Sequence, residues 1–409
     1  MSNKKNNKIY LDYAATTPVD KEVLKEMLPY FMGNFGNASS VHSFGQEAIA
    51  VIDRSREKIA KFFNCGFNEI IFTGSATEAN NLAILGIARS VSPASDRNLV
   101  KTMHFITSVI EHESVLEPLK ELQKIGHEIT YLPVNKDGFI NISDLEKAIK
   151  NNTVLVSVIY ANNEIGTIQP IKEIGKFIEK INSKRREANL PKIYFHTDAV
   201  QALQFLECRP DWLKVDLMTF SGHKIYGPKG IGGLYVRKNT PIFPVISGGG
   251  QEFGLRSGTE NVASIVGFAK AIELVFKNRE VQFKHILNLR DKLLNYIIKN
   301  NEEIKVNGAL NPSTSLRTSN RLPNNLNLRF PGISNETLLV ALDQAGVAVS
   351  AGSACSSRAL GVSHVLKAIG LNEGQAKESI RITLGKNTNE KEIKKAAEII
   401  SKTFQRLKI

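Results

Sequence analysis

The sequence has few of the residues and patterns that mark disulfide-rich, metal-binding or membrane proteins. Its 409 residues include only three cysteines, Cys65, Cys208 and Cys355, which lie far apart and share no metal-type spacing. No apolar run approaches the roughly 20 residues that a transmembrane helix needs, and the polar residues 1–8 lack the apolar core of a signal peptide. We therefore expect no metal site, no membrane contact and a reducing, cytoplasmic location.

Basic residues outnumber acidic residues, and the formal net charge is +13. Such a charge favours nucleic acid or acidic proteins as partners, but the simpler explanation is a basic composition throughout the chain. The lysines are scattered, and they form no basic helix or aromatic-lined basic groove. Direct nucleic-acid binding is therefore not expected, and the basic residues 184–186 are interpreted as a solvated patch.

The central part of the chain alternates between apolar strands and helices, which is typical of an α/β fold with a mostly parallel sheet. Helices between the strands would cover both faces of the sheet and give a three-layer αβα domain. The runs interpreted as strands are 69–73, 105–110, 153–159, 193–198 and 215–220.

The rest of the chain predicts a smaller α+β domain. A long helical stretch at 262–299 is interpreted as the connection to it, and the polar stretch 310–325 is expected at the surface. We expect a large domain of residues 17–265 and a small domain of residues 1–16 and 266–409. The short strands and the final helix assigned to the small domain are 325–330, 346–350, 379–385 and 390–409.

Lys224 is the first candidate for chemistry. It lies in a glycine-rich turn, 221–230, between the apolar strand 215–220 and a second predicted strand that ends at Val236. An amine held in a partly desolvated turn has a lowered pKa and can form a Schiff base. Among the carbonyl cofactors that need a Schiff base, pyridoxal phosphate is the commonest, so the sequence should also supply partners for its ring and phosphate.

Three other strand ends offer those partners. Asp198 ends an apolar strand, where a carboxylate needs a cation such as a protonated pyridine nitrogen. The small-residue turn 74–77 between a strand and a helix could bind a phosphate through free N–H groups, although a capped helix without a ligand has the same pattern. His112 follows another strand and is either structural or a ligand contact. No G-x-G-x-x-G or Walker-type lysine is present, so a nucleotide is less expected.

The second half of the chain adds a thiol and a cation. Cys355 lies among Ala, Gly and Ser residues with little bulk to bury it, whereas Cys65 and Cys208 are interpreted as buried core residues. A thiolate on a loop of small residues could move into an active site. Arg381, on a predicted strand, could bind a carboxylate through two hydrogen bonds.

Taken in order, these motifs resemble the cysteine desulfurases of the class V aminotransferase group, which are fold type I pyridoxal-phosphate transferases. The similarity covers nearly the whole chain, and the short serine-flanked cysteine motif is similar to the iron–sulfur and nitrogen-fixation branch. The motifs that carry the resemblance to the cysteine desulfurases are LDYAATTP (11–18), ATEANNLA (76–83), EH (111–112), NNEIG (162–166), HTDAVQ (196–201), SGHKIYGPKGIG (221–232), RSGTEN (256–261), SAGSACSS (350–357) and SIRITLG (379–385).

The resemblance implies a role toward pyridoxal 5'-phosphate for each matched residue. Lys224 would form the Schiff base and move the substrate's α-proton, and His112 would stack on the ring. Asp198 would pair with the ring nitrogen, while Gln201 and Asn163 would lie near the ring hydroxyl. The residues implied to bind the phosphate are Ala76, Thr77, Ser221, His223 and, from the other subunit of a homodimer, Thr259.

The resemblance also implies the reaction. Arg381 and Asn163 would hold the carboxylate of L-cysteine, and Cys355 would take its sulfur as a persulfide while L-alanine is released. An acceptor such as an iron–sulfur scaffold protein would receive the sulfur, with Cys355 as a possible iron–sulfur ligand during transfer; tRNA thiolation is a second destination. The acceptor is left open, because the longer tail with which some members dock a scaffold is not expected after the last helix.

One departure and two alternatives accompany the resemblance. The phosphate turn reads Thr73-Gly74-Ser75, where the family usually has a serine before the glycine. A selenocysteine lyase or general cysteine lyase would not need Cys355. A subunit that binds a partner or tRNA without catalysis would not need Lys224, Asp198 and His112.

Overall fold

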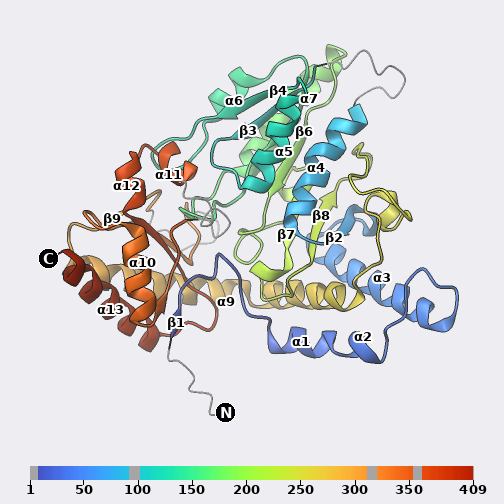
Figure 1. The fold of residues 1–409 in the computed structure, drawn as a ribbon. Coiled ribbons are helices and arrows are strands. Elements are labelled where there is room, and N and C mark those ends of the chain that lie inside the picture. The colour runs from blue at the N-terminus through green and yellow to red at the C-terminus, as the bar shows by residue number, and fades with distance from the viewer. Residues whose placement is uncertain (1–7, 92–101, 311–319, 353–361, 409) are drawn as a thin grey trace.

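The computed structural model describes residues 8–91, 102–310, 320–352 and 362–408, and it forms a large and a small layered unit joined by one long helix (Figure 1). The large unit is built on a seven-stranded sheet with the order β2-β8-β7-β6-β5-β3-β4. These strands are β2 (Ile70–Thr73), β3 (His104–Ser108), β4 (Glu128–Leu132), β5 (Thr153–Ser157), β6 (Tyr194–Asp198), β7 (Leu217–Ser221) and β8 (Gly232–Val236).

The sheet is mostly parallel, as predicted. β7, β6, β5, β3 and β4 run in one direction, and β8 alone is antiparallel to both of its neighbours, β2 and β7. The parallel strands are buried on both faces and rich in apolar residues, which is typical of sheets covered on two sides. Their carboxyl ends meet at one edge, where ligands bind in such folds.

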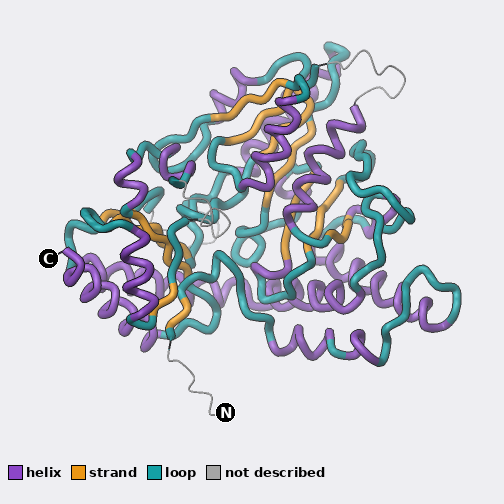
Figure 2. The backbone as a smooth tube through the Cα atoms, in the orientation of Figure 1, coloured by secondary structure: helices purple, strands orange, loops and turns teal. Residues whose placement is uncertain are grey.

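Helices cover both faces of this sheet and complete the predicted three layers (Figure 2). α4 (Ala76–Val91) and α5 (Glu113–Lys124) pack on one face, while α3 (Ser43–Phe63) and α7 (Ile171–Glu187) pack on the other. Shorter helices complete the unit: α1 (Lys21–Met27), α2 (Pro29–Met32), α6 (Ile142–Ala148), α8 (Pro210–Leu213), and the 3-10 turns η1 (Phe67–Glu69), η2 (Gly222–Lys224) and η3 (Glu252–Gly254).

The smaller unit contains a three-stranded antiparallel sheet and a two-stranded parallel ribbon, so the predicted α+β character is confirmed. The ribbon joins the start of the chain to its last quarter. The strands are β1 (Ile9–Tyr10), β9 (Lys305–Val306), β10 (Asn325–Arg329), β11 (Val347–Ala348) and β12 (Ser379–Thr383), and the helices are α10 (Asn335–Gln344), α11 (His364–Ala368), α12 (Glu373–Lys377) and α13 (Glu390–Lys408).

The two units are joined by α9 (Val262–Asn300), which runs along the base of both (Figure 1). A helix of 39 residues is about 58 Å long at 1.5 Å per residue. One end packs against α1 and α3 and the other against α13. The expected boundary at residues 265 and 266 lies in the first turns of this helix and stays a prediction.

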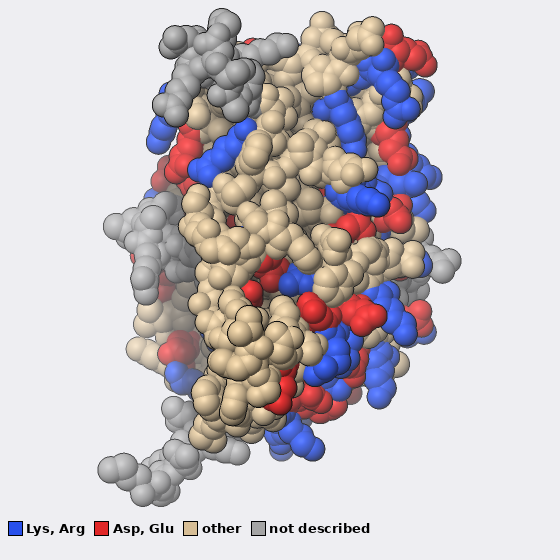
Figure 3. Space-filling model, turned by 90° about the vertical axis from the view of Figure 1, so that its right-hand side faces the viewer, with Lys and Arg blue, Asp and Glu red and all other residues tan. Residues whose placement is uncertain are grey.

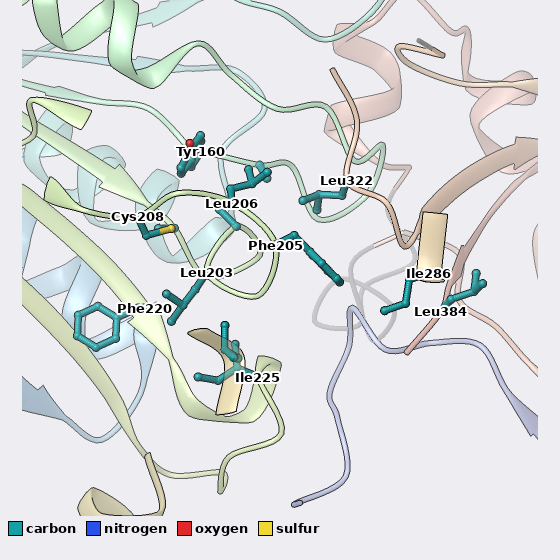
Figure 4. Close-up of a cluster of buried hydrophobic side chains, with 14 of the residues drawn as sticks. Tyr160, Leu203, Phe205, Leu206, Cys208, Phe220, Ile225, Ile286, Leu322 and Leu384 are labelled. Atoms are coloured by element: carbon teal, nitrogen blue, oxygen red, sulfur yellow. The ribbon is translucent and has the colours of Figure 1, made fainter. Parts of the chain in front are cut away.

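Cys208 lies in the apolar core, as its sequence context predicted. Its side chain is fully buried among residues such as Leu203 and Phe220 (Figure 4). Burial raises the pKa of the Cys208 thiol to about 12, and burial likewise raises the pKa of the half-buried Cys65 to about 12. Neither thiol is a thiolate at neutral pH, so neither is suited to nucleophilic chemistry.

Two surface assignments were wrong in part. Lys184 and Arg186 are exposed as predicted, and residues 311–319 of the stretch 310–325 lie outside the described residues. Arg185 is not solvated: its side chain is buried, and its guanidinium donates hydrogen bonds to the carbonyls of Lys150, Asn151 and Pro191. The end of the stretch expected at the surface is buried as well, since Arg321 is only 1% exposed. A polar sequence marks a loop, but it does not show whether tertiary contacts cover that loop.

Candidate active site

A cavity of about 360 Å³ opens at the carboxyl edge of the parallel strands. It collects side chains from β6, β7, the start of α4 and the small unit, which lie far apart in the sequence. The predicted site residues that line it are Ala76, Thr77, His112, Asn163, Asp198, Gln201, Ser221, His223, Lys224 and Arg381.

Lys224 ends the 3-10 turn that follows β7, so its amine reaches the cavity from a strand end, as predicted. Its Nζ donates hydrogen bonds to the carbonyl oxygens of Ala14 at 2.6 Å and Ala15 at 2.7 Å. The amide of Gln201 also donates to the Ala14 carbonyl, at 3.1 Å. The segment after β1 therefore closes one side of the cavity and orients two predicted cofactor contacts.

Asp198 is held in a fixed orientation at the end of β6. Its Oδ2 accepts a hydrogen bond from Asn80 Nδ2 at 2.8 Å, and its Oδ1 accepts one from the N–H of Val200 at 3.0 Å. Asn80 is fully buried and also donates to the hydroxyl of Ser114 at 2.8 Å. Sequence reasoning missed Asn80, although its place one helical turn after the phosphate turn puts it on the same face of α4 as Ala76.

His112 caps the start of α5. Its Nδ1 accepts the N–H of Ser114 at 3.1 Å, so the neutral ring carries its proton on Nε2. Burial lowers the pKa of His112, and the nearby charge of Lys224 lowers it further while Asp198 opposes the shift. The imidazole is therefore neutral at pH 7 beside the partly buried amine of Lys224, and it is able to exchange a proton.

The turn before α4 is well ordered despite its unusual sequence. The hydroxyl of Thr73 donates to the carbonyl of Ser75 at 2.9 Å, and the hydroxyl of Ser75 accepts the N–H of Glu78 at 3.1 Å. Helix α4 begins at Ala76, so the N–H groups of Ala76 and Thr77 have no partner within the helix. They form a site suited to an anion at a helix N-terminus.

His223 and Ser221 line the same cavity as that turn. Ser221 ends β7 and is almost completely buried. Burial lowers the pKa of His223 to about 4, with Lys224 and Lys229 adding to the effect. A neutral imidazole at this position can donate a hydrogen bond to an anion without carrying a charge of its own.

Arg381 on β12 brings the small unit into the site. Its guanidinium is 1% exposed, and it donates to the carbonyl of Asn163 at 3.0 Å and to Asp12 Oδ1 at 2.8 Å. The Nε of Arg381 is buried and has no hydrogen-bond partner among the described residues. A buried guanidinium that is only partly satisfied beside a cavity is suited to a carboxylate ligand.

Two predicted site residues are not placed in the cavity. Cys355 lies outside the described residues, although the backbone of Ser350, five residues earlier, pairs with Arg381 in an isolated bridge. Thr259 is exposed and does not line the cavity of its own chain. Its predicted contact with the other subunit of a dimer stays a prediction.

The residues that line the cavity fit pyridoxal 5'-phosphate. An amine, an oriented buried carboxylate and free N–H groups at a helix N-terminus surround one space, which matches the three polar ends of that molecule. Among the described residues, no group of three or more His, Cys, Asp or Glu side chains could hold a metal ion. In the same part of the chain, no helix has both the length and the apolar composition needed to cross a bilayer.

The fold and this site define a fold type I transferase of the α/β class, and comparison with known proteins gives the family. Residues 9–395 match the model of the aminotransferase class-V family, so the chain belongs to it. The chain is 45% identical to "Cysteine desulfurase IscS" of Dictyoglomus turgidum over 98% of its own length and 95% of the relative's. It is 43% identical to "Cysteine desulfurase IscS 1" of Archaeoglobus fulgidus over 98% and 97%.

Solved structures agree with these relatives. A "NifS-like protein" superposes with a TM-score of 0.85 at 36% identity and covers 98% of this chain and 99% of its own. A structure named "SspA in complex with cysteine" superposes with a TM-score of 0.75 at 37% identity over 92% and 98%. The resemblance to cysteine desulfurases that the motifs indicated is thereby confirmed.

Proposed function

We propose that this chain is a pyridoxal-phosphate-dependent cysteine desulfurase, which converts L-cysteine to L-alanine and keeps the sulfur as a persulfide on Cys355. The observation that carries the proposal is the meeting of Lys224, Asp198 and the N-terminus of α4 around one cavity. Pyridoxal phosphate, when bound, supplies an electron sink for the α-carbon of an amino acid. The relatives' names support cysteine as that amino acid.

We assign the residues of the cavity separate roles toward the phosphate, the ring and the substrate. Ala76, Thr77, Ser221 and His223 would hold the phosphate, and Asp198, Gln201 and Asn163 would orient the ring. Lys224 would hold the cofactor covalently and then move the α-proton of the substrate. His112 would lie against the ring and exchange a proton through Nε2, and Arg381 with Asn163 would hold the substrate carboxylate.

Sulfur transfer needs a thiol on the protein in addition to the thiol of the substrate. The Cys355 thiolate would attack the sulfur of the bound substrate, so that an S–S bond forms and the carbon–sulfur bond breaks. The electron pair of the broken bond goes to the carbon fragment, which is protonated and leaves as L-alanine. The sulfur stays on Cys355 as a persulfide, and a second thiol on a sulfur acceptor can then take it.

The same chemistry suggests the partners. An iron–sulfur scaffold protein, with Cys355 as an iron–sulfur ligand during transfer, is the proposed acceptor, and tRNA thiolation is a second destination. A cytoplasm that keeps thiols reduced is the compartment we propose, because a free Cys355 thiol is required.

A homodimer is proposed on a broad, mostly uncharged face (Figure 3). This face carries α2, the segment between α2 and α3, and the loop before α9. Its exposed apolar side chains include Met32 at 81%, Phe35 at 66%, Val41 at 92% and Phe253 at 51%. Large exposed apolar side chains on an uncharged face are suited to an interface, and Thr259, in the loop before α9, is exposed as well.

The test is a single-turnover reaction of the purified protein with L-cysteine, followed by measurement of L-alanine and protein-bound sulfane sulfur. We expect both products from the wild type and neither from Cys355→Ser, while Cys65→Ser forms both. If Cys355→Ser still releases alanine, the chain is a lyase in which this thiol is incidental. If neither protein releases alanine, selenocysteine becomes the substrate to examine, and then the non-catalytic alternative.

A further inference from the structure

An ion pair joins the loop before α9 to the turn at the phosphate site. Arg256 Nε donates to Glu78 Oε1 at 2.7 Å, and Glu78 Oε2 accepts the N–H of Gly74 at 2.9 Å. Both charged side chains are about three-quarters buried, at 24% and 21% exposed. One carboxylate therefore links a loop residue to the backbone of the turn, although Arg256 lies 178 residues after Glu78 in the sequence.

Gly74 is closely enclosed by this pair. A Cβ added at Gly74 would lie 2.9 Å from Glu78 Oε2 and 3.4 Å from Arg256 Nη2. Because Glu78 occupies the N–H of Gly74, that group cannot also bind an anion. The N–H groups of Ala76 and Thr77 are then left to form the anion site, and their direction depends on how Glu78 holds the turn.

The position of Glu78 creates an electrostatic problem that Arg256 solves. Glu78 lies in the first turn of α4, beside the site proposed for a phosphate. The carboxylate of Glu78 and a phosphate at this site are both negative, and in a partly buried site their repulsion would weaken phosphate binding. Arg256 supplies the compensating positive charge at the carboxylate itself.

We infer that Arg256 and Glu78 act as a positioning pair for the cofactor phosphate, in which Glu78 fixes the turn and Arg256 cancels its charge. The inference rests on the proposed function, because it assumes a phosphate at Ala76 and Thr77. Neither residue lines the cavity, so both act through the turn rather than by touching the ligand.

The loop that carries Arg256 is braced so that the pair keeps its geometry. Gln251 Oε1 accepts the N–H of Gly258 at 2.9 Å, and Ser257 Oγ accepts the N–H of Gly250 at 3.3 Å. Arg256 is also three residues before Thr259. The same pair therefore fixes where the loop leaves the phosphate turn of its own chain and extends toward the proposed dimer face.

The test separates the phosphate contribution from everything else by using two ligands. Apoprotein is titrated with pyridoxal 5'-phosphate and with pyridoxal, which lacks the phosphate, and binding is followed by absorbance. We expect Arg256→Gln to weaken pyridoxal 5'-phosphate about tenfold and to leave pyridoxal unchanged. Arg256→Lys should retain most of the affinity, and Arg256→Gln/Glu78→Gln should recover most of it, because both charges are then absent.

The controls distinguish this pair from a general structural effect. Arg237→Gln breaks ion pairs elsewhere in the large unit, with Asp211 and Asp216, and should change neither affinity. Equal weakening of both ligands by Arg256→Gln, or no recovery in the double variant, would overturn the inference. If the wild type binds neither ligand, the proposed function fails instead, since the phosphate site would then have no cofactor to hold.

Discussion

The side-chain amide of Asn80 donates a hydrogen bond of 2.8 Å to Asp198, and this contact fixes the carboxylate that faces the cavity. The second N–H of the Asn80 amide is bound to Ser114, so the amide cannot rotate away without losing two hydrogen bonds. Ser114 Oγ lies 2.8 Å from Nδ1 of His112. One buried asparagine therefore connects the residue proposed at the ring nitrogen with the residue proposed at the ring face.

Asn80→Ala should lower turnover by about 10- to 100-fold, because a hydrogen bond to a charged group contributes about 1.5–3 kcal/mol. The effect arises from a carboxylate that is no longer aimed at the ring nitrogen. Steady-state kinetics with saturating cofactor would measure it. The control is Asn278→Ala, which removes a hydrogen bond from the side-chain amide of Asn278 to the Leu274 carbonyl on α9 and should keep full turnover. Unchanged turnover in Asn80→Ala would mean that Asp198 is oriented without this amide.

Arg381→Lys should raise the KM for L-cysteine by about 10- to 100-fold, since a lysine cannot reproduce the planar pair of hydrogen bonds to a carboxylate. The matched ligand is cysteamine, which has the amine and the thiol of cysteine but no carboxylate. Its apparent affinity should change little, and competition with L-cysteine would measure it. An equal loss for both ligands would show that Arg381 acts by holding Asn163 and Asp12 rather than the substrate.

The sequence was sufficient to predict which strand-end residues meet at the cavity, but it was not sufficient to predict the residues that orient them. His112, Asp198 and Lys224 could be predicted because parallel strands bring their carboxyl ends to one edge, which follows from the order of apolar runs alone. Asn80 contacts Asp198 on β6, and Glu78 contacts Arg256 in the loop before α9, and both partners are more than one hundred residues away in the sequence. Helical spacing shows which face of α4 Asn80 and Glu78 occupy, but not what that face meets.

The same limit explains why Arg185 and Arg321 were expected at the surface but are buried. A run of three basic residues is expected to be solvated because buried arginines are rare, yet the Arg185 guanidinium is buried and donates hydrogen bonds to the backbone carbonyls of Lys150, Asn151 and Pro191. The antiparallel direction of β8 also depends on the glycine-rich turn after Lys224, since a short connection returns the chain beside β7 in the opposite direction. The length of this turn is visible in the sequence, and a connection that short favours an antiparallel return.

Glu111 should make the folded chain less stable as the pH rises. It is fully buried, and burial raises the pKa of its carboxyl to about 8 from an ordinary value of 4.5. The folded chain therefore keeps a proton that the unfolded chain releases above pH 4.5. The stabilisation is present in full below pH 4.5 and is lost as the pH rises to about 8.

Glu111→Gln should remove this dependence, because glutamine keeps an oxygen to accept the N–H of Ile159 but cannot ionise. Denaturant unfolding at pH 5 and pH 8.5 would show the gap in the free energy of unfolding between the variant and the wild type shift in favour of the variant, by an amount on the order of a few kcal/mol. Glu117→Gln on the exposed side of α5 is the control. A gap of the same size at both pH values would contradict a protonated Glu111.

Breaking the ion pair between Arg56 and Glu252 should cost the most stability. Their side chains are 5% and 3% exposed, and the guanidinium makes two hydrogen bonds of 2.7 Å to the carboxylate. The guanidinium also lies 4.7 Å from the ring centroid of Phe72 and 4.9 Å from that of Phe253, so it cannot reach water if its partner is removed.

Glu252→Gln should therefore lower the free energy of unfolding by about 3–5 kcal/mol, because it leaves a buried charge without a counter-charge. Replacing both residues, as in Arg56→Met/Glu252→Gln, should recover part of that loss, since no unpaired charge remains. Denaturant unfolding would measure both variants. The control is Lys292→Ala, which breaks the surface ion pair between Lys292 and Glu390, whose side chains are 36% and 63% exposed. That pair should contribute under about 1 kcal/mol to the free energy of unfolding. If Glu252→Gln costs no more than this surface control, the loop before α9 is held in place by packing of Phe253 and not by charge, and its connection to the phosphate turn would then depend on Arg256 alone.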